Sequence, residues 1–230
     1  MSNVPTHVAI IMDGNRRWAK AQGKKSVDGH KKGLENLTNL SEHIFKSGVK
    51  VLSVYAFSTE NFNRSEEEIS YIMKMFVNNI GKVVKKLKEN NIKIVFSGRK
   101  TGLSDDVIEK IQELEEISKN NTAAIFNVCF NYGGQAEIVD ATKKIIENNI
   151  SSDNITIEMF GSYLYNDLPQ VDLMLRPGGE QRLSNFLLWQ NSYAEFYFTD
   201  ILFPDFNEVE YDKALSAYQE RNRRFGGNIK

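Results

Sequence analysis

Four short polar turns carry the residue types that bind phosphate and magnesium. They cover residues 13–18, 58–64, 131–134 and 176–184. Arginine offers a planar fork that matches phosphate oxygens, and serine adds a short hydroxyl donor. The carboxylate of Asp13 is a hard oxygen ligand of the kind that Mg²⁺ combines with substrate phosphates and waters. The turns therefore predict a diphosphate and magnesium site with residues 13–18 at its centre.

Local structure offers other roles for single members of these turns. Gly14 would let backbone N–H groups approach an anion at a helix N-terminus, whereas Asp13 could be the N-cap of that helix. Asn61 could form an Asx turn, and Trp18 and Phe62 could belong to the core. Each alternative explains one residue but not the joint pattern.

The polar turns follow apolar segments that predict strands. Continuous apolar runs at 8–12, 51–57, 123–130 and 171–175, and a fifth at 92–96, are typical of parallel strands buried on both faces. Helices are predicted over residues 66–88 (about 34 Å at about 1.5 Å per residue), after Ser104, and around 138–146. Ser65 and Glu68 form a candidate capping box for the first of these helices. We expect one α/β domain over residues 1–230, in which a mostly parallel central sheet is flanked by helices and the turns meet at the carboxyl ends of its strands.

Composition argues against several other classes of protein. Lys+Arg 29 against Asp+Glu 30 leave a net charge of −1, so no nucleic-acid partner is expected. The basic residues gather locally between Asp13 and Gly33, a pattern that by itself favours a solvated helix face. Cys129 is the single cysteine and has apolar neighbours, which predicts a buried thiol in a reducing compartment. No signal peptide or membrane span is visible, so a cytoplasmic protein is expected.

Two common phosphate-binding motifs are missing from the sequence. It contains neither a Gly-x-x-x-x-Gly-Lys-Ser/Thr loop nor a Gly-x-Gly-x-x-Gly turn, which argues against nucleotide and dinucleotide binding. Its only adjacent aspartates, Asp105 and Asp106, lack the Asp-Asp-x-x-Asp spacing of trans-prenyl synthases.

Several motifs in the same order make the chain resemble the cis-prenyltransferases, most closely the bacterial undecaprenyl diphosphate synthases. The matching segments are HVAIIMDGN at 7–15, GH at 29–30, YAFSTEN at 55–61, NYGG at 131–134, SNFLLWQ at 184–190, YAEFYF at 193–198 and RRFGG at 223–227. The resemblance covers about residues 7 to 227. It implies a fold with a hydrophobic tunnel and an enzyme that adds isopentenyl diphosphate to an allylic diphosphate, usually farnesyl diphosphate, with a cis double bond at each step.

The resemblance also implies roles for individual residues. Asp13 and Glu195 would hold Mg²⁺, and Asn61 would accept the proton lost in each condensation, although a carboxamide is a weak base. The allylic diphosphate would be surrounded by Gly14, Asn15, Arg16, Arg17 and His30. The isopentenyl diphosphate would be held by Arg176, Arg182 and Ser184. The remaining predicted substrate-binding residues are Trp18, Ser58, Thr59, Glu60, Phe62, Arg64 and Leu183.

Some positions depart from the family pattern. Arg16 stands where glycine is usual, Ser26 where arginine is usual, and Gln181 where many members have histidine near the metal. These changes leave open three activities: synthesis of long-chain undecaprenyl diphosphate, synthesis of a short or irregular cis-prenyl diphosphate, and a non-catalytic scaffold role. Small Ala56 favours a long product. The resemblance further implies a homodimer that contacts the membrane surface transiently through its lipid product.

Overall fold

Six parallel strands form the centre of the computed structural model, which describes residues 4–221 apart from the side chain of Lys82. Their spatial order is β3-β4-β2-β1-β5-β6. The strands are β1 (His7–Ile11), β2 (Val51–Ser58), β3 (Ile92–Ser97), β4 (Ala124–Tyr132), β5 (Leu173–Pro177) and β6 (Glu195–Thr199). The predicted parallel sheet is confirmed, β6 being the one strand that the apolar runs did not indicate. The motif at 223–227 lies outside the described residues.

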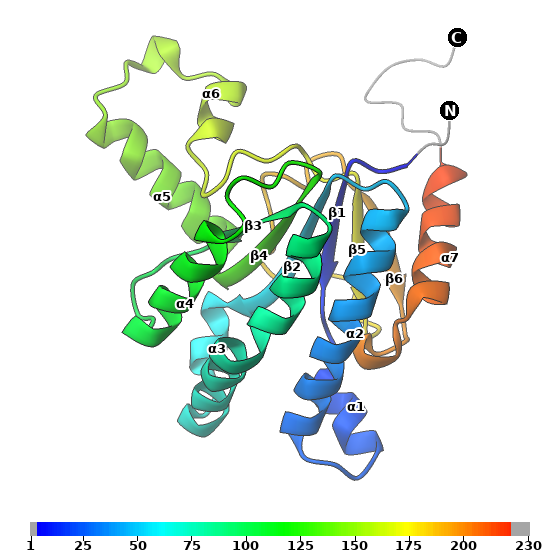
Figure 1. The fold of residues 1–230 in the computed structure, drawn as a ribbon. Helices are drawn as coiled ribbons and strands as arrows, with labels where there is room; N and C mark the ends of the chain where they lie inside the picture. The colour runs from blue at the N-terminus through cyan, green and yellow to red at the C-terminus, as the bar shows by residue number, and fades with distance from the viewer. Residues whose placement is uncertain (1–3, 222–230) are drawn as a thin grey trace.

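Helices cover one face of the sheet and extend beyond its edge. In Figure 1, α2, α3 and α4 lie in front of the strands, α7 lies beside β6, and α5 with α6 projects away from the rest of the chain. The helices are α1 (Asn15–Ala21), α2 (Ser26–Lys46), α3 (Glu66–Glu89), α4 (Asp105–Glu116), α5 (Gly134–Glu147), α6 (Ile157–Ser162) and α7 (Glu208–Gln219). Short 3₁₀ helices are η1 (Thr59–Asn63), η2 (Ser152–Asn154) and η3 (Phe203–Asp205). Within residues 4–221, none of these helices is long and apolar enough to span a bilayer.

Both faces of the sheet are buried, which explains the continuous apolar runs. Alternate residues of β1 belong to different cores, since Val8 and Ile10 pack in the cluster that includes side chains of α2, α3 and α4. Ala9 and Ile11 pack in a second cluster with Phe186 and Leu187 of the segment between β5 and β6. Cys129 is fully buried in this second cluster, as predicted, and burial raises the pKa of its thiol well above the usual value.

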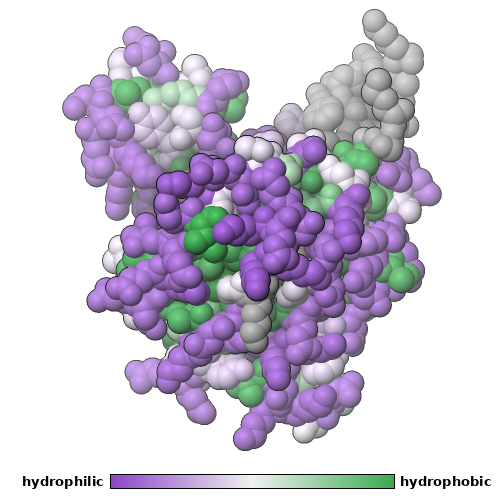
Figure 2. Space-filling model, in the orientation of Figure 1, coloured by the Kyte–Doolittle hydropathy of each residue, from purple (hydrophilic) through white to green (hydrophobic). Residues whose placement is uncertain are grey.

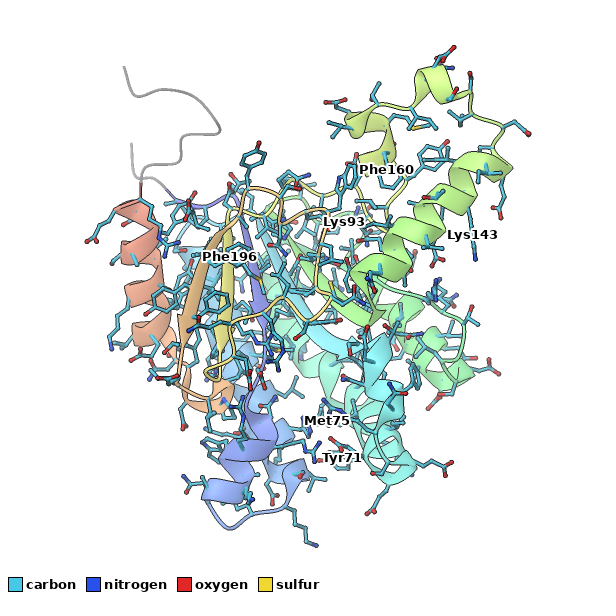
Figure 3. All side chains as sticks on the ribbon, turned by 180° about the vertical axis from the view of Figure 1, so that it is seen from behind. Tyr71, Met75, Lys93, Lys143, Phe160 and Phe196 are labelled. Carbon is cyan, nitrogen blue, oxygen red and sulfur yellow. The ribbon has the colours of Figure 1, made fainter. Side chains whose placement is uncertain are left out.

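An apolar tunnel runs between the sheet and helices α2 and α3. It belongs to a cavity of about 670 Å³, which α3 lines with residues between Ile72 and Ile80, a span of about 12 Å at about 1.5 Å per residue. Figure 3 shows Tyr71 and Met75 on α3, in the space between this helix and the α1–α2 pair. Hydrophilic side chains cover most of the outer face of these helices, with only small apolar patches between them (Figure 2). The apolar lining consists of Ile11, Met12, Leu34, Leu37, Val54, Ala56, Ile72, Met75, Phe76, Ile80, Phe126, Val128, Phe130 and Phe203.

The strand order reverses at the neighbouring strands β1 and β5. From β1 the chain continues to β2 on one side, whereas from β5 it continues to β6 on the other. In open α/β sheets such a reversal leaves a crevice at the carboxyl ends of the strands, where ligands bind. Asp13 follows β1, and Arg176 is the penultimate residue of β5. The fold therefore brings together the two turns that the sequence predicted to be richest in phosphate-binding residues.

Candidate active site

Asp13 and Arg176 form the fixed centre of the site. The Nη2 atom of Arg176 donates to Oδ2 of Asp13 over 2.9 Å, and Nη2 of Arg17 lies 3.1 Å from Oδ1. Burial would raise the pKa of Asp13, but the hydrogen bond and charge of Arg176, with those of Arg17, outweigh it and lower the pKa below its usual value. Asp13 is therefore a carboxylate at neutral pH, as a magnesium ligand must be.

Arg176 also shapes the turn that follows β5. Its side chain is only 4% exposed. From Nη1 it donates to Ser184 Oγ over 2.8 Å and to the carbonyl oxygen of Arg182. One guanidinium thus holds the aspartate of one turn and the backbone and hydroxyl of another. Arg182 itself is 61% exposed and pairs with Glu180, so its fork can turn toward a ligand.

A second group of cations surrounds Glu68 on α3. Arg64 Nη1 lies 2.9 Å from Glu68 Oε1, and Arg16 Nη1 lies 3.6 Å from Oε2. His30 Nε2 is 3.8 Å from Oε1, which is too long for a hydrogen bond. Burial, followed by the charge of Arg64, lowers the pKa of His30, so its imidazole favours the neutral form. The sequence did not indicate this role of Glu68, because the capping box already gave it a local explanation.

The predicted capping box forms only in part. Ser65 Oγ accepts from the backbone N–H of Glu68 over 3.4 Å. The Glu68 carboxylate, however, turns to the cations described above instead of returning to the N-cap backbone. The position of Glu68 in the first turn of α3 was therefore predicted correctly. The main interactions of its carboxylate depend instead on how α3 meets α1 and α2.

The turn after β2, which ends at Arg64, lines the cavity with several of its residues. Asn61 Oδ1 accepts from the backbone N–H of Ser58 over 3.1 Å, so Asn61 caps η1 and lines the cavity at the same time. Glu60 Oε1 accepts from Asn185 Nδ2 over 2.7 Å. Burial alone would raise the pKa of Glu60, but hydrogen bonds, first that from Asn185, lower it below its usual value. Asn185 lines the cavity but was not among the predicted site residues.

Two glycines of α2 allow Asn15 to reach the mouth of the cavity. A Cβ atom at Gly29 would lie 2.0 Å from the backbone oxygen of Asn15, and one at Gly33 would lie 2.2 Å from its Oδ1. Helices α1 and α2 therefore approach more closely than any side chain would permit. Gly14, the N-cap of α1, has φ 101°, a conformation that favours glycine.

Most of the predicted residues gather around two adjoining spaces. The mouth of the tunnel is lined by Asp13, Asn15, His30, Ser58, Glu60, Asn61, Arg64, Arg176, Arg182 and Ser184. A second, basic recess of about 950 Å³ shares part of this wall and adds Gly14, Arg16, Arg17, Lys20, Lys24 and Lys25. A polar, cationic entrance thus opens into an apolar tunnel.

Four predicted substrate-binding residues do not line either space. Trp18 Nε1 donates to Asp205 over 2.9 Å, and Phe62 packs edge-to-face on Phe57. Leu183 packs against the second core cluster, and Thr59 lies beside Gly133. The alternative of a core position is wrong for both aromatic residues, since Phe62 is 38% exposed and Trp18 is only half-buried.

The structure does not bring Glu195 to Asp13. Glu195 begins β6 opposite Leu173, whereas Phe198 is opposite Arg176, so Glu195 lies toward the amino ends of the strands. Its carboxylate pairs with Arg221 Nη1 at 2.7 Å. Within residues 4–221 no group of three or more His, Cys, Asp and Glu side chains could hold a metal. The magnesium site predicted from Asp13 and Glu195 is therefore not assembled by the described part of one chain.

The mouth nevertheless fits a magnesium ion that is brought by a diphosphate. Mg²⁺ usually binds through one or two carboxylates together with waters and substrate phosphates. Asp13 supplies an ionised carboxylate, and each of its oxygens has a second lone pair besides the one that accepts from an arginine. Buried polar atoms without a hydrogen-bond partner among the described residues also line the mouth: Asn15 Oδ1, His30 Nε2 and Arg176 Nε. Such atoms indicate a polar ligand.

Fold and site together define a class of protein: an α/β fold in which a cationic mouth at the carboxyl ends of parallel strands opens into an apolar cavity. Residues 11–226 match the family described as "Putative undecaprenyl diphosphate synthase". Since the match covers most of the sequence, the chain belongs to this family, and it is a cis-prenyltransferase.

Individual relatives agree with this assignment. An isoprenyl transferase of Fusobacterium nucleatum is 50% identical over 98% of this chain and 97% of its own length. A farnesyl-diphosphate-specific ditrans,polycis-undecaprenyl-diphosphate synthase of Pasteurella multocida is 47% identical over 98% and 96%. Among solved structures, lavandulyl diphosphate synthase of Lavandula x intermedia in complex with dimethylallyl diphosphate has a TM-score of 0.93 at 38% identity, covering 97% and 98%. A probable undecaprenyl diphosphate synthase of Campylobacter jejuni has a TM-score of 0.83 at 35% identity, covering 97% and 99%.

Proposed function

We propose that this enzyme condenses isopentenyl diphosphate with farnesyl diphosphate, repeatedly and with Mg²⁺, to form undecaprenyl diphosphate. The observation that carries the proposal is the junction of a cationic mouth with an apolar tunnel in one cavity. Diphosphate groups fit the mouth because arginine forks match phosphate oxygens. A growing hydrocarbon chain fits the tunnel because its lining is aliphatic and aromatic.

The chain's own residues divide the work of the reaction. Arg16, Arg17 and His30 bind the allylic diphosphate, and Arg182 and Ser184 bind the isopentenyl diphosphate. As the bond between the allylic carbon and its diphosphate breaks, negative charge grows on the leaving group. Cations already held in place stabilise that charge without a cost for reorientation. Asp13 would hold Mg²⁺ together with the diphosphate, and the bound ion would supply further charge stabilisation as a Lewis acid.

A proton must leave the new carbon skeleton after each condensation. Asn61 lines the cavity at the end of β2 and is the proposed acceptor. Its Oδ1 already accepts from the Ser58 backbone, which orients the carboxamide toward the mouth. Because a carboxamide is a weak base, the proton passes on to the departing diphosphate, which is a stronger one.

The product and the surroundings of the enzyme complete the proposal. Small Ala56 in the tunnel lining leaves room for a long chain. The lipid product brings the enzyme into transient contact with the membrane surface, and the enzyme works as a homodimer. Glu195 does not reach Asp13 within one described chain. If Glu195 binds the metal, it must therefore do so across the dimer, together with residues of the other subunit.

The test is product analysis with radiolabelled isopentenyl diphosphate, farnesyl diphosphate and Mg²⁺. We expect a long-chain lipid, and chelation of Mg²⁺ should stop its formation. The variant Asp13→Asn keeps an acceptor for Arg176 but removes the negative charge, so turnover should fall by about 10²–10³ while the circular dichroism spectrum stays unchanged. Asp140→Asn is the matched control, since Asp140 also pairs with an arginine, Arg99, but does not line the cavity.

A short or irregular product is the second candidate, favoured by the TM-score of 0.93 to lavandulyl diphosphate synthase. Incubation with dimethylallyl diphosphate in place of farnesyl diphosphate discriminates between the two. A short product that does not elongate would establish the second candidate, whereas no product with either starter would establish a non-catalytic scaffold.

A further inference from the structure

The segment after Arg182 adopts a strained backbone at the mouth of the cavity. Three of its non-glycine residues have positive φ: Ser184 at 49°, Asn185 at 63° and Leu187 at 44°. Left-handed conformations cost such residues about 1–2 kcal/mol each, with asparagine tolerating them best. Contacts with the rest of the protein must therefore hold the segment in place.

Asn185 supplies several of these contacts. Its backbone oxygen accepts from Gly134 N over 2.7 Å, and its Oδ1 accepts from Gln135 N over 2.9 Å. Both are N–H groups in the first turn of α5, which have no partner inside the helix. Its Nδ2 donates to Glu60 Oε1 over 2.7 Å. One side chain thus joins the segment after β5, the start of α5 and the turn after β2.

The glycines at the start of α5 make room for this arrangement. A Cβ atom at Gly133 would lie 2.8 Å from Asn185 Nδ2, and one at Gly134 would lie 2.7 Å from Leu188 Cγ. Gly133 does not need a positive φ, since its φ is −155°. The NYGG motif is therefore explained here by the close approach of residues 185–188.

Asn185 connects the two sides of the mouth. On one side, Arg182 and Ser184 are held by Arg176. On the other side, Glu60 and Asn61 belong to the turn after β2. Among the described residues, the hydrogen bond from Asn185 to Glu60 is the only direct one between side chains of these two segments.

We propose that Asn185 is a positioning residue that sets the distance between the isopentenyl-diphosphate side of the mouth and the Glu60–Asn61 side. The proposal rests on the proposed function, because it assigns the two sides to different parts of one condensation. A displacement of about 1 Å between reacting groups can lower a rate by about 10²-fold. Loss of the connection should therefore reduce turnover more than it reduces binding of either substrate.

Three variants separate positioning from backbone structure. Asn185→Gly suits a φ of 63° at least as well as asparagine but has no side chain, so it removes the connection without adding strain. Asn185→Asp keeps an acceptor for Gln135 N but places a carboxylate against Glu60, and it carries the test if the glycine variant does not fold. Asn149→Gly is the matched control, because Asn149 also has a positive φ of 52° and lies beyond α5, away from the cavity.

The variants are compared by steady-state kinetics, by calorimetric titration with isopentenyl diphosphate alone, and by hydrogen exchange. For Asn185→Gly we expect kcat to fall by about 10–10²-fold, with the Kd for isopentenyl diphosphate changed less than about threefold. Backbone exchange should rise in residues 59–63 and 182–188 together. Asn149→Gly should match the wild type in all three measurements.

Other outcomes would overturn the proposal. A kcat within about twofold of the wild type would show that the connection is not needed for turnover. A loss confined to Kd would make Asn185 a binding residue, and a loss of kcat without changed exchange would point to direct substrate contact. If the wild-type enzyme forms no product, the proposed function fails, and the exchange data still decide whether Asn185 ties the two segments together.

Discussion

Replacing Arg176 by lysine tests whether the site depends on the shape of the guanidinium or only on its charge. Arg176 reaches Asp13 with Nη2 over 2.9 Å and Ser184 with Nη1 over 2.8 Å. A lysine ammonium is a compact charge on a flexible stem and cannot span both acceptors with a fixed geometry. Arg176→Lys therefore keeps the charge next to Asp13 but gives up the contact that shapes the turn at 182–184.

The size of the effect follows from burial. The Arg176 side chain is 4% exposed, so water cannot replace a lost partner. A hydrogen bond to a charged group contributes about 1.5–3 kcal/mol, and we take about 2 kcal/mol for one lost contact. For a domain of this size each kcal/mol shifts Tm by about 2–4 °C, so Tm should fall by about 4–8 °C. If the same contact is lost from the bound substrate complex, kcat/KM for isopentenyl diphosphate should fall about 30-fold.

The assay needs a control with the same chemistry in a different place. Arg99 is such a residue, because its Nε and Nη2 each lie 2.8 Å from a carboxylate oxygen of Asp140. Its side chain is 38% exposed and does not line the cavity. Arg99→Lys should cost no more than about 1 kcal/mol and leave kcat/KM unchanged. Thermal unfolding followed by circular dichroism and steady-state kinetics are measured on both variants.

If the two variants behave alike, the site does not depend on the shape of the Arg176 guanidinium. A Tm for Arg176→Lys within about 2 °C of the wild type, together with kcat/KM within about threefold, would mean that the lysine charge alone satisfies Asp13. In that case the planar fork would not be the feature that organises the turn at 182–184.

Three further changes have defined outcomes. Burial lowers the pKa of His7 to about 4 from 6.5, so between these pH values the unfolded chain takes up a proton that the folded chain excludes. The free energy of unfolding should therefore fall by about 3 kcal/mol from pH 6.5 to pH 4. Urea unfolding of the variant His7→Asn should lack this part of the pH dependence. Gly29→Ala places a Cβ 2.0 Å from the backbone oxygen of Asn15. The clash should lower the free energy of unfolding, measured in urea, by about 1–3 kcal/mol, and by displacing Asn15 it should weaken binding of the allylic diphosphate. Ala56→Leu fills part of the tunnel and should shorten the product in chromatography without loss of initial turnover; an unchanged product would exclude Ala56 from length control.

The sequence predicted the meeting of the polar turns because parallel strands end at a common edge. Asp13 and Arg176 are 163 residues apart, yet each ends or follows an apolar run whose burial on both faces could be recognised from the sequence. Strand β6 was missed because its residues are only half-buried, as is typical of an edge strand, and its aromatic run, Phe196 to Phe198, is shorter than the about four to eight apolar residues that indicate a buried strand.

Other contacts could not be predicted because they depend on how separate elements meet. Glu68 had a sufficient local explanation as a capping residue, and the arginines and histidine around it come from α1, α2 and the turn after β2. Asn185 meets Glu60 over 125 residues of sequence, and no local pattern marks that pair. Glu195 was assigned from the family resemblance, whereas the register of β6 against β5 decides its place at the other end of the sheet.

Exposure separates the arginines of the mouth into two kinds. Arg176 is 4% exposed and is committed to Asp13 and to the turn at 182–184, so it can orient the site but has little freedom to follow a substrate. Arg16, Arg17 and Arg182 are 59%, 49% and 61% exposed, and each pairs with a carboxylate, namely that of Glu68, Asp13 and Glu180 respectively. Exposed pairs of this kind contribute little to stability, so a diphosphate can exchange places with the carboxylates at small cost. We therefore expect a diphosphate to replace the carboxylate partners of the exposed arginines while Arg176 keeps its contacts. Mutation of the exposed arginines should then raise KM and leave Tm nearly unchanged.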